Sequence, residues 1–95
     1  MRWTWDPSKA KVNFEKHKVS FSLAERALED PLCISVPDPY PQEDRWRTLG
    51  SPTTDGIVVL YVVHTWPESE LGVGRIISAR KATNRERQEY EERQS

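Results

Sequence analysis

Three short stretches of this 95-residue chain carry basic side chains, and two of them include a histidine or a carboxylate. They are Lys16-His17, Glu43 with Arg45, and a later pair, Arg75 and Arg80. Together these types suit phosphodiester cleavage, because cations stabilise an anionic transition state while histidine or carboxylate moves protons. RNA carries its own nucleophile, the 2′-hydroxyl beside the phosphorus, so such chemistry needs no metal.

Each stretch also has an explanation that involves no substrate. A helix C-terminus favours cations, which accounts for Lys16 and His17. Glu43 and Arg45 suit a surface ion pair as well as a phosphate clamp. An odd number of positions separates Arg75 from Arg80, so a regular strand would point them to opposite faces. They converge only if the strand ends or bulges before Arg80.

Metal and cofactor chemistry finds little support in the pattern. Cys33 is the single cysteine, and His17 and His64 lie far apart with no metal-ligand spacing. No glycine-rich phosphate loop, nucleophile elbow or dinucleotide fingerprint is present. We therefore expect neither a metal nor a cofactor. His64 sits in an apolar run, and we interpret it as a hydrogen-bonded histidine at the edge of the core.

Composition predicts one globular domain over residues 1–95. Hydrophobic residues make up 36% of the chain and charged residues 31%, which is typical of a folded protein. The net charge is −1, but basic residues prevail near both ends and acidic residues between them, so a local basic surface forms if the ends meet. The longest apolar run, 57–63, is far shorter than a bilayer span, and no leader-like segment opens the chain. We expect a cytoplasmic protein without membrane contact.

Periodicity and turn signals predict an α+β fold. Residues 2–5 read as a strand, and Asp6-Pro7 begins a helix over about 7–17. Ser20 caps a second helix that ends before Asp30-Pro31. Strands follow over 32–36, 45–50, 57–65 and 73–79, and a capping box at Thr83 opens a last helix that either lies on the surface or packs against a partner. We expect an antiparallel meander in which 57–65 is the central strand, covered on both faces, and the proline-rich segment 37–41 is irregular.

A set of short motifs runs along nearly the whole chain. In chain order they are Trp3-Thr4-Trp5-Asp6-Pro7 with Lys9 and Asn13, Lys16-His17, Val19-Ser20-Phe21, Asp30-Pro31, the Glu43/Arg45 region, Gly50 and Arg75-Ile76-Ile77-Ser78-Ala79-Arg80-Lys81-Ala82-Thr83 with Glu86 and Tyr90. Together they resemble the BrnT toxins. One departure is Lys18, where the family usually has the glycine that favours a left-handed helix cap.

The resemblance implies a RelE-like fold and a ribonuclease that stops translation by degrading RNA. It also implies a cognate BrnA-type ribbon-helix-helix antitoxin, through which alone the toxin would contact operator DNA. The candidate site residues, which match family positions and suit this chemistry, are Lys16, His17, Glu43, Arg45, Arg75 and Arg80. We expect Glu43 or His17 to transfer protons and the other four to supply charge.

Two other functions remain open at this stage. The first is a protein-binding module of the same fold without catalysis, which the low pI of about 6.1 and the sparsely apolar last helix favour. The second is a DNA-binding regulator that acts alone. The acidic middle of the chain and the lack of a helix-turn-helix pattern weigh against that one.

Overall fold

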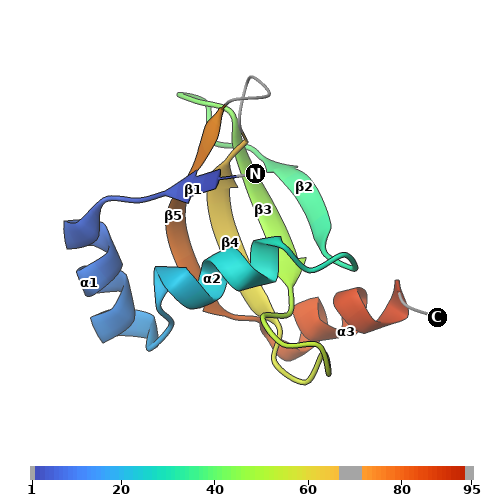
Figure 1. Cartoon of the computed structure of the whole chain (residues 1–95). Helices are drawn as coiled ribbons and strands as arrows, with labels where there is room; N and C mark the ends of the chain where they lie inside the picture. The colour runs from blue at the N-terminus through green and yellow to red at the C-terminus, as the bar shows by residue number, and fades with distance from the viewer. Residues whose placement is uncertain (1, 67–71, 94–95) are drawn as a thin grey trace.

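Five strands form one mixed sheet in the computed structural model, which describes residues 2–66 and 72–93 (Figure 1). The strands are β1 (Arg2–Thr4), β2 (Ile34–Asp38), β3 (Arg45–Gly50), β4 (Leu60–Thr65) and β5 (Val73–Lys81). Their order is β1-β5-β4-β3-β2, where β2 to β5 form an antiparallel meander and β1 runs parallel to β5. The helices are α1 (Pro7–His17), α2 (Phe21–Leu28) and α3 (Asn84–Glu92). The α+β class is confirmed; the RelE-like label stays a prediction.

The helix starts follow the caps that the sequence contains. The Asp6 carboxylate accepts hydrogen bonds from the first free N–H groups of α1, and the Ser20 hydroxyl does the same for α2. At α3 the Thr83 hydroxyl and the Glu86 carboxylate form a reciprocal capping box. These local interactions fix where each helix begins and therefore how it meets the sheet.

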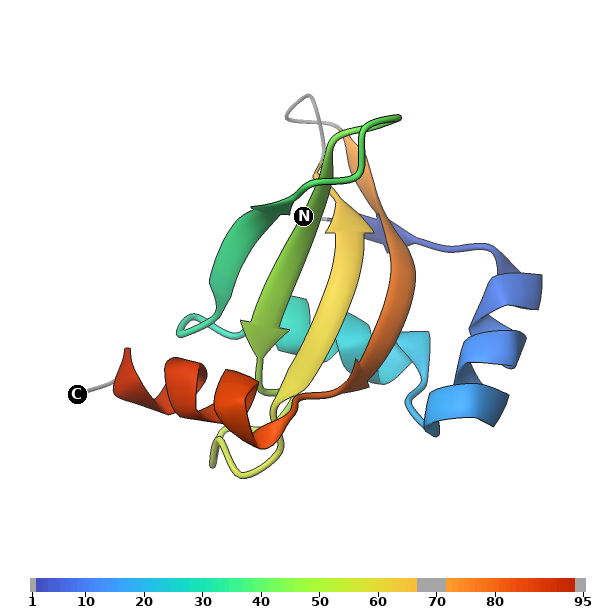
Figure 2. The same cartoon turned by 180° about the vertical axis from the view of Figure 1, so that it is seen from behind.

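One face of the sheet, which we call the core face, carries the main hydrophobic core. Helix α2 packs across β3, β4 and β5 on this face, and α1 lies along β5 (Figure 1). The buried residues are Val19, Phe21, Ala24, Ala27, Leu60, Val62, Ile76 and Ala79. Gly50 permits the close approach of α2, because a Cβ there would collide with the carbonyl of Ala27. On the opposite face, the outer face, α3 crosses part of the sheet (Figure 2).

Asn13 hydrogen-bonds to the edge of β5 in the part of that strand that extends beyond β1. Its side-chain amide donates to the Ala79 carbonyl at 2.8 Å, and its carbonyl oxygen accepts from the Ala79 N–H at 3.1 Å. The same amide donates to Val19 O at 3.1 Å. A buried polar side chain is stable only when its partners are present, and here one asparagine pairs both backbone groups of an edge residue.

His64 is fully buried on the core face, and both of its ring nitrogens are hydrogen-bonded. Its Nδ1 lies 2.9 Å from the Thr65 carbonyl, which can only accept, so Nδ1 carries the proton. Nε2 therefore accepts from the Thr48 hydroxyl at 2.6 Å, and Thr48 in turn accepts from Ser35 at 2.7 Å. Burial lowers the pKa of His64 from its ordinary value, so the ring is neutral and structural rather than catalytic.

Three expectations for the strands are wrong. The central strand begins at Leu60 rather than Ile57, which is 63% exposed. It is not covered on both faces, because its burial alternates, as in an antiparallel sheet with one face against the core. Strand β2 begins at Ile34 and continues through Pro37 and Asp38, since an edge strand tolerates a proline that cannot donate to a neighbour.

None of the helices within residues 2–66 and 72–93 combines the length and the apolar character needed to cross a membrane.

Lys18 occupies the left-handed cap of α1 despite its side chain, with φ 60° and ψ 27°. Its N–H donates to the Phe14 carbonyl at 2.8 Å. This backbone conformation costs a non-glycine residue about 1–2 kcal/mol, partly offset by the lower chain entropy of lysine in the unfolded state.

We expect Lys18→Gly to raise the free energy of unfolding by about 0.5–1 kcal/mol, measured by urea denaturation. Lys11→Gly is the matched control, because Lys11 is exposed in the helical interior of α1. That change should lower the free energy of unfolding by about 1 kcal/mol. If Lys18→Gly lowers the free energy of unfolding as much as Lys11→Gly does, Lys18 does not occupy the left-handed cap.

Candidate functional site

A β-bulge in β5 decides which side chains face outward. Val63 pairs with Ser78 and His64 pairs with Ile76, so Ile77 has no partner in β4. Beyond the bulge the alternation of the strand is inverted. Ile76 and Ala79 are accordingly both buried on the core face, although they lie three positions apart.

The bulge brings Arg75 and Arg80 to the same face. Arg75 precedes the core-facing Ile76, and Arg80 follows the core-facing Ala79, so both point to the outer face. The condition set from the sequence, a bulge before Arg80, is met. Arg45 and Arg47 join them, since they alternate along β3 with Trp46 and Thr48, which oppose core-facing residues of β4. Arg45, Arg47, Arg75 and Arg80 thus lie on the outer face, which is the face of the sheet seen in Figure 2.

Glu43 links two of these arginines from different strands. Arg45 Nε donates to Glu43 Oε1 at 2.8 Å, and one terminal nitrogen of Arg75 donates to Oε1 and Oε2 at 2.8 and 3.1 Å. The hydrogen bond from Arg45, followed by that from Arg75, holds the pKa of Glu43 below its ordinary value. The Arg45 guanidinium also lies 3.8 Å from the centre of the Tyr40 ring. Glu43, Arg45 and Arg75 form a single charged cluster.

Arg80 is held by a carboxylate and an aromatic ring together. Its two terminal nitrogens donate to Glu86 Oε1 and Oε2 at 2.8 and 3.0 Å, and its guanidinium lies 4.0 Å from the centre of the Tyr61 ring. The hydrogen bond from Arg80 lowers the pKa of Glu86, which also accepts from the Thr83 N–H at 2.8 Å. Arg80 is thereby fixed at the N-terminus of α3, an arrangement suited to anions.

Arg47 belongs to the same surface, although the set of candidates from the sequence omitted it. Its Nε is buried and makes no hydrogen bond within the described residues, since the Asp38 carboxylate lies 3.6 Å away. Contact with the Tyr61 hydroxyl raises the pKa of Arg47. The signal was in the sequence, because Arg45 and Arg47 are two positions apart on a strand and must share a face.

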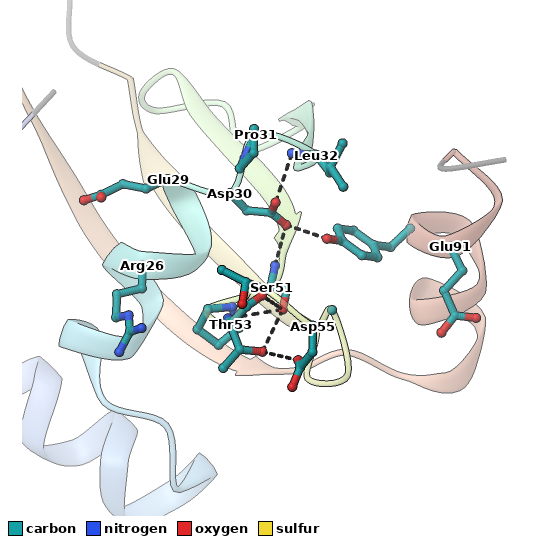
Figure 3. A pocket seen from close by; sticks show the side chains of 13 residues that line it. Arg26, Glu29, Asp30, Pro31, Leu32, Ser51, Thr53, Asp55 and Glu91 are labelled. Carbon is teal, nitrogen blue, oxygen red and sulfur yellow. Dashed lines mark hydrogen bonds between the residues drawn. The ribbon is translucent and has the colours of Figure 1, made fainter.

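Helix α3 is fixed over the outer face by Asp30 (Figure 3). The Asp30 carboxylate accepts from the Tyr90 hydroxyl at 2.5 Å, from Ser51 N at 2.8 Å and from Leu32 N at 3.0 Å. These bonds lower the pKa of Asp30 despite its partial burial. The group lines a cavity of about 590 Å³, which lies away from the four arginines. Its role is to anchor the helix that positions Glu86.

Lys16 and His17 lie elsewhere. They line a hollow of about 370 Å³ between α1 and the bulge residues Ile77 and Ser78. No hydrogen bond, ion pair or cavity among the described residues joins them to Glu43 or to the arginines. The six predicted residues thus form three groups rather than one pocket: the Glu43 cluster, Arg80 with Glu86 on the same face, and the α1 pair.

Metal ligation has no candidate group in the part of the chain that the structure describes. Nowhere in residues 2–66 and 72–93 do three histidine, cysteine, aspartate or glutamate side chains gather as a metal ion would require. The outer face therefore offers charge through guanidinium groups and a carboxylate.

Comparison with known proteins decides the family. The family model described as "Ribonuclease toxin, BrnT, of type II toxin-antitoxin system" matches residues 5–86. The chain belongs to the BrnT ribonuclease toxin family. A solved structure, the 1.1 Å crystal structure of the Brucella abortus ribonuclease toxin BrnT, shares the fold with a TM-score of 0.60. It is 22% identical, and the match covers 88% of this chain and 99% of that one. No curated protein matches the sequence.

Membership in the BrnT family has one direct consequence for partners. A type II system pairs a protein toxin with a protein antitoxin, so an antitoxin is the expected partner of this BrnT family member.

The Glu43 cluster can be tested by titration. We expect the pKa of the Glu43 carboxyl, followed by NMR, to lie below 4.5 and to rise in Arg45→Ala and Arg75→Ala, because each change removes a donor. Arg26→Ala is the control, since Arg26 is an exposed residue of α2 outside the cluster. A Glu43 pKa that is the same in all four proteins would show that the cluster does not form in solution.

Proposed function

We propose that this chain is an endoribonuclease that cleaves single-stranded RNA on the outer face of its sheet without a metal or cofactor. The observation that carries the proposal is the cluster of Glu43 with Arg45 and Arg75, continued by Arg47 and Arg80 on the same face. These residues supply a carboxylate that can accept a proton and guanidinium groups that match phosphate oxygens.

In this mechanism Arg45 and Arg75 bind the scissile phosphate, and Glu43 takes the proton from the adjacent 2′-hydroxyl. The 2′-oxygen forms a bond to phosphorus and the bond to the 5′-oxygen breaks, which gives a 2′,3′-cyclic phosphate and, after proton uptake, a 5′-hydroxyl. Binding itself favours the proton transfer. As phosphate oxygens take over the arginine donors, the interactions that lower the pKa of Glu43 weaken, and the carboxylate becomes a stronger base.

The spacing of the arginines supports binding of an extended strand. Five positions, one of them in the bulge, separate Arg75 from Arg80, so their backbones lie about 13 Å apart at the rise of a β-strand. Glu43 holds the Arg75 guanidinium and Glu86 holds the Arg80 guanidinium, so the two groups are not directed at one phosphate. Arg80 and Arg47 therefore bind parts of the RNA beyond the scissile phosphate, and affinity falls as salt rises.

In this proposal Lys16 and His17 contact RNA that flanks the cleaved linkage. They lie on α1 beside the bulge, and His17 is half-buried while Lys16 is exposed. Their separation from the Glu43 cluster favours Glu43 over His17 as the general base.

The cellular part of the proposal follows the family. RNA cleavage inhibits translation by degrading messages, and a BrnA-type ribbon-helix-helix antitoxin neutralises the toxin. Operator DNA is contacted only through that antitoxin. The net charge of −1 supports this last point, because a chain without overall positive charge lacks the general attraction to duplex DNA.

We expect the antitoxin-free protein to cleave RNA in the presence of EDTA, and Arg75→Ala and Arg80→Ala each to lower the cleavage rate by about tenfold or more. The reason is that each change removes charge stabilisation from the bound phosphates. Arg26→Ala, on the other side of the sheet, should cleave at the rate of the unmodified protein. Circular dichroism establishes that each variant is folded.

RNA that stays intact at high protein concentration would overturn the nuclease and favour a protein-binding module without catalysis. Cleavage that is unchanged in Arg75→Ala and Arg80→Ala would place the site away from the outer face.

A further inference from the structure

A further cavity opens beside the arginines of the outer face. It measures about 400 Å³ and lies between β2, β3, β4 and α3, at the part of the sheet that α3 crosses in Figure 2. Its floor is apolar, and its rim carries charges of both signs. The lining residues that matter are Val36, Leu49, Tyr61, Arg47, Glu86 and Glu89.

This cavity is continuous with the proposed RNA path. Tyr61 and Glu86 line it, and both contact Arg80, through the ring at 4.0 Å and the carboxylate at 2.8 Å. Arg47, whose buried Nε makes no hydrogen bond within the described residues, lines it as well. An RNA whose backbone follows these arginines therefore brings a base to the mouth of the cavity.

The lining suits a flat group with apolar faces and a polar edge. Val36 is 41% exposed and Leu49 is buried, and together they offer an apolar floor. Tyr61 and the guanidinium groups of Arg47 and Arg85 supply planar surfaces. Proteins read unstacked RNA bases in this way, by stacking on aromatic rings or guanidinium planes and by hydrogen bonds to the base edge.

Glu89 determines which base edge fits. Both oxygens of the neighbouring Glu86 are bound by Arg80, and one also accepts from the Thr83 N–H. Glu89 is exposed on α3, and no hydrogen bond or ion pair of its carboxylate is found among the described residues. A free carboxylate accepts hydrogen bonds from the exocyclic amino group of a base, as in carboxylate contacts to the cytosine amino group. Uracil carries carbonyl oxygens at the corresponding positions, which a carboxylate repels.

We propose that this cavity is a base-recognition pocket, in which Glu89 accepts from the amino group of adenine, cytosine or guanine next to the cleaved linkage and disfavours uracil. The proposal rests on the proposed ribonuclease function and adds the substrate class to it. Glu89 acts as a specificity residue here, while cleavage itself belongs to the Glu43 cluster.

The test is to digest a long RNA of mixed sequence and to sequence the new 5′ ends. The unmodified protein should cut at least about tenfold less often where one fixed position beside the cut is uridine, the range expected for one well-placed base contact. Glu89→Gln, which can both donate and accept, should reduce that bias to less than about threefold. Glu91→Gln is the matched control on α3, because Glu91 is exposed and lies outside this cavity. It should cut like the unmodified protein.

Each other result has a distinct meaning. If Glu89→Gln cleaves RNA with an unchanged base bias, the pocket proposal is wrong and the ribonuclease stands. If the unmodified protein cleaves no RNA, both the ribonuclease proposal and the pocket proposal are wrong. If Glu89→Gln alters only the affinity for the antitoxin and leaves the cleavage pattern as it was, the pocket belongs to the protein partner, which also overturns base recognition.

Discussion

One unpaired residue, Ile77, determines the chemistry that this sheet presents. Without the bulge, strand alternation would turn Arg75 to the core face, beside His64 and Trp3, which packs over Gly74. A guanidinium there would lose its hydration and its partner Glu43, at a cost of several kcal/mol. With the bulge, both arginines of β5 point outward and the aromatic core stays apolar. Bulges are common near active sites for this reason: they redirect a side chain without changing the fold.

Two interactions on either side of the sheet stabilise the geometry that the bulge creates. Asn13 pairs with the backbone of Ala79, two residues after Ile77, and so fixes the strand edge next to the bulge. Asp30 holds Tyr90 and thereby the helix that carries Glu86 to Arg80. Neither residue belongs to the Glu43 cluster or contacts Arg80 directly. They act by limiting the positions that the arginines and α3 can adopt.

Local chemistry predicted the helices well and the sheet less well. Asp6, Ser20 and Thr83 cap helices because their side chains bond to N–H groups two or three residues away, which sequence alone reveals. The predicted strand over 57–65 is longer than β4, because β-branched residues favour an extended backbone whether or not a neighbouring strand is present. The sequence prediction ends the second strand before Pro37. A strand accepts a proline when it lies at the edge of a sheet, and the sheet order that puts β2 at the edge is not encoded locally.

The candidate site shows the same division. That Arg45 and Arg47 share a face follows from strand periodicity, whereas the convergence of Arg75 and Arg80 depends on the pairing of β5 with β4, which no local pattern encodes. The ion pair of Glu43 with Arg75 spans 32 positions, and the pairing of Arg80 with Glu86 depends on how α3 meets the sheet, so the sequence predicts neither pair. These carboxylates fix the arginine side chains before any ligand binds. A phosphate must therefore compete with the carboxylates, but it meets guanidinium donors that are already oriented.

The most direct test of the outer face as the RNA-binding surface is NMR titration with a single-stranded RNA whose 2′-hydroxyls are methylated, which blocks the nucleophile. The arginine Nε–Hε signals report on each guanidinium separately, and the backbone amide signals report on α1 and α2. Our account predicts that the largest shifts occur at Arg45, Arg47, Arg75 and Arg80. Shifts confined to α1, around Lys16 and His17, or to α2 would contradict it.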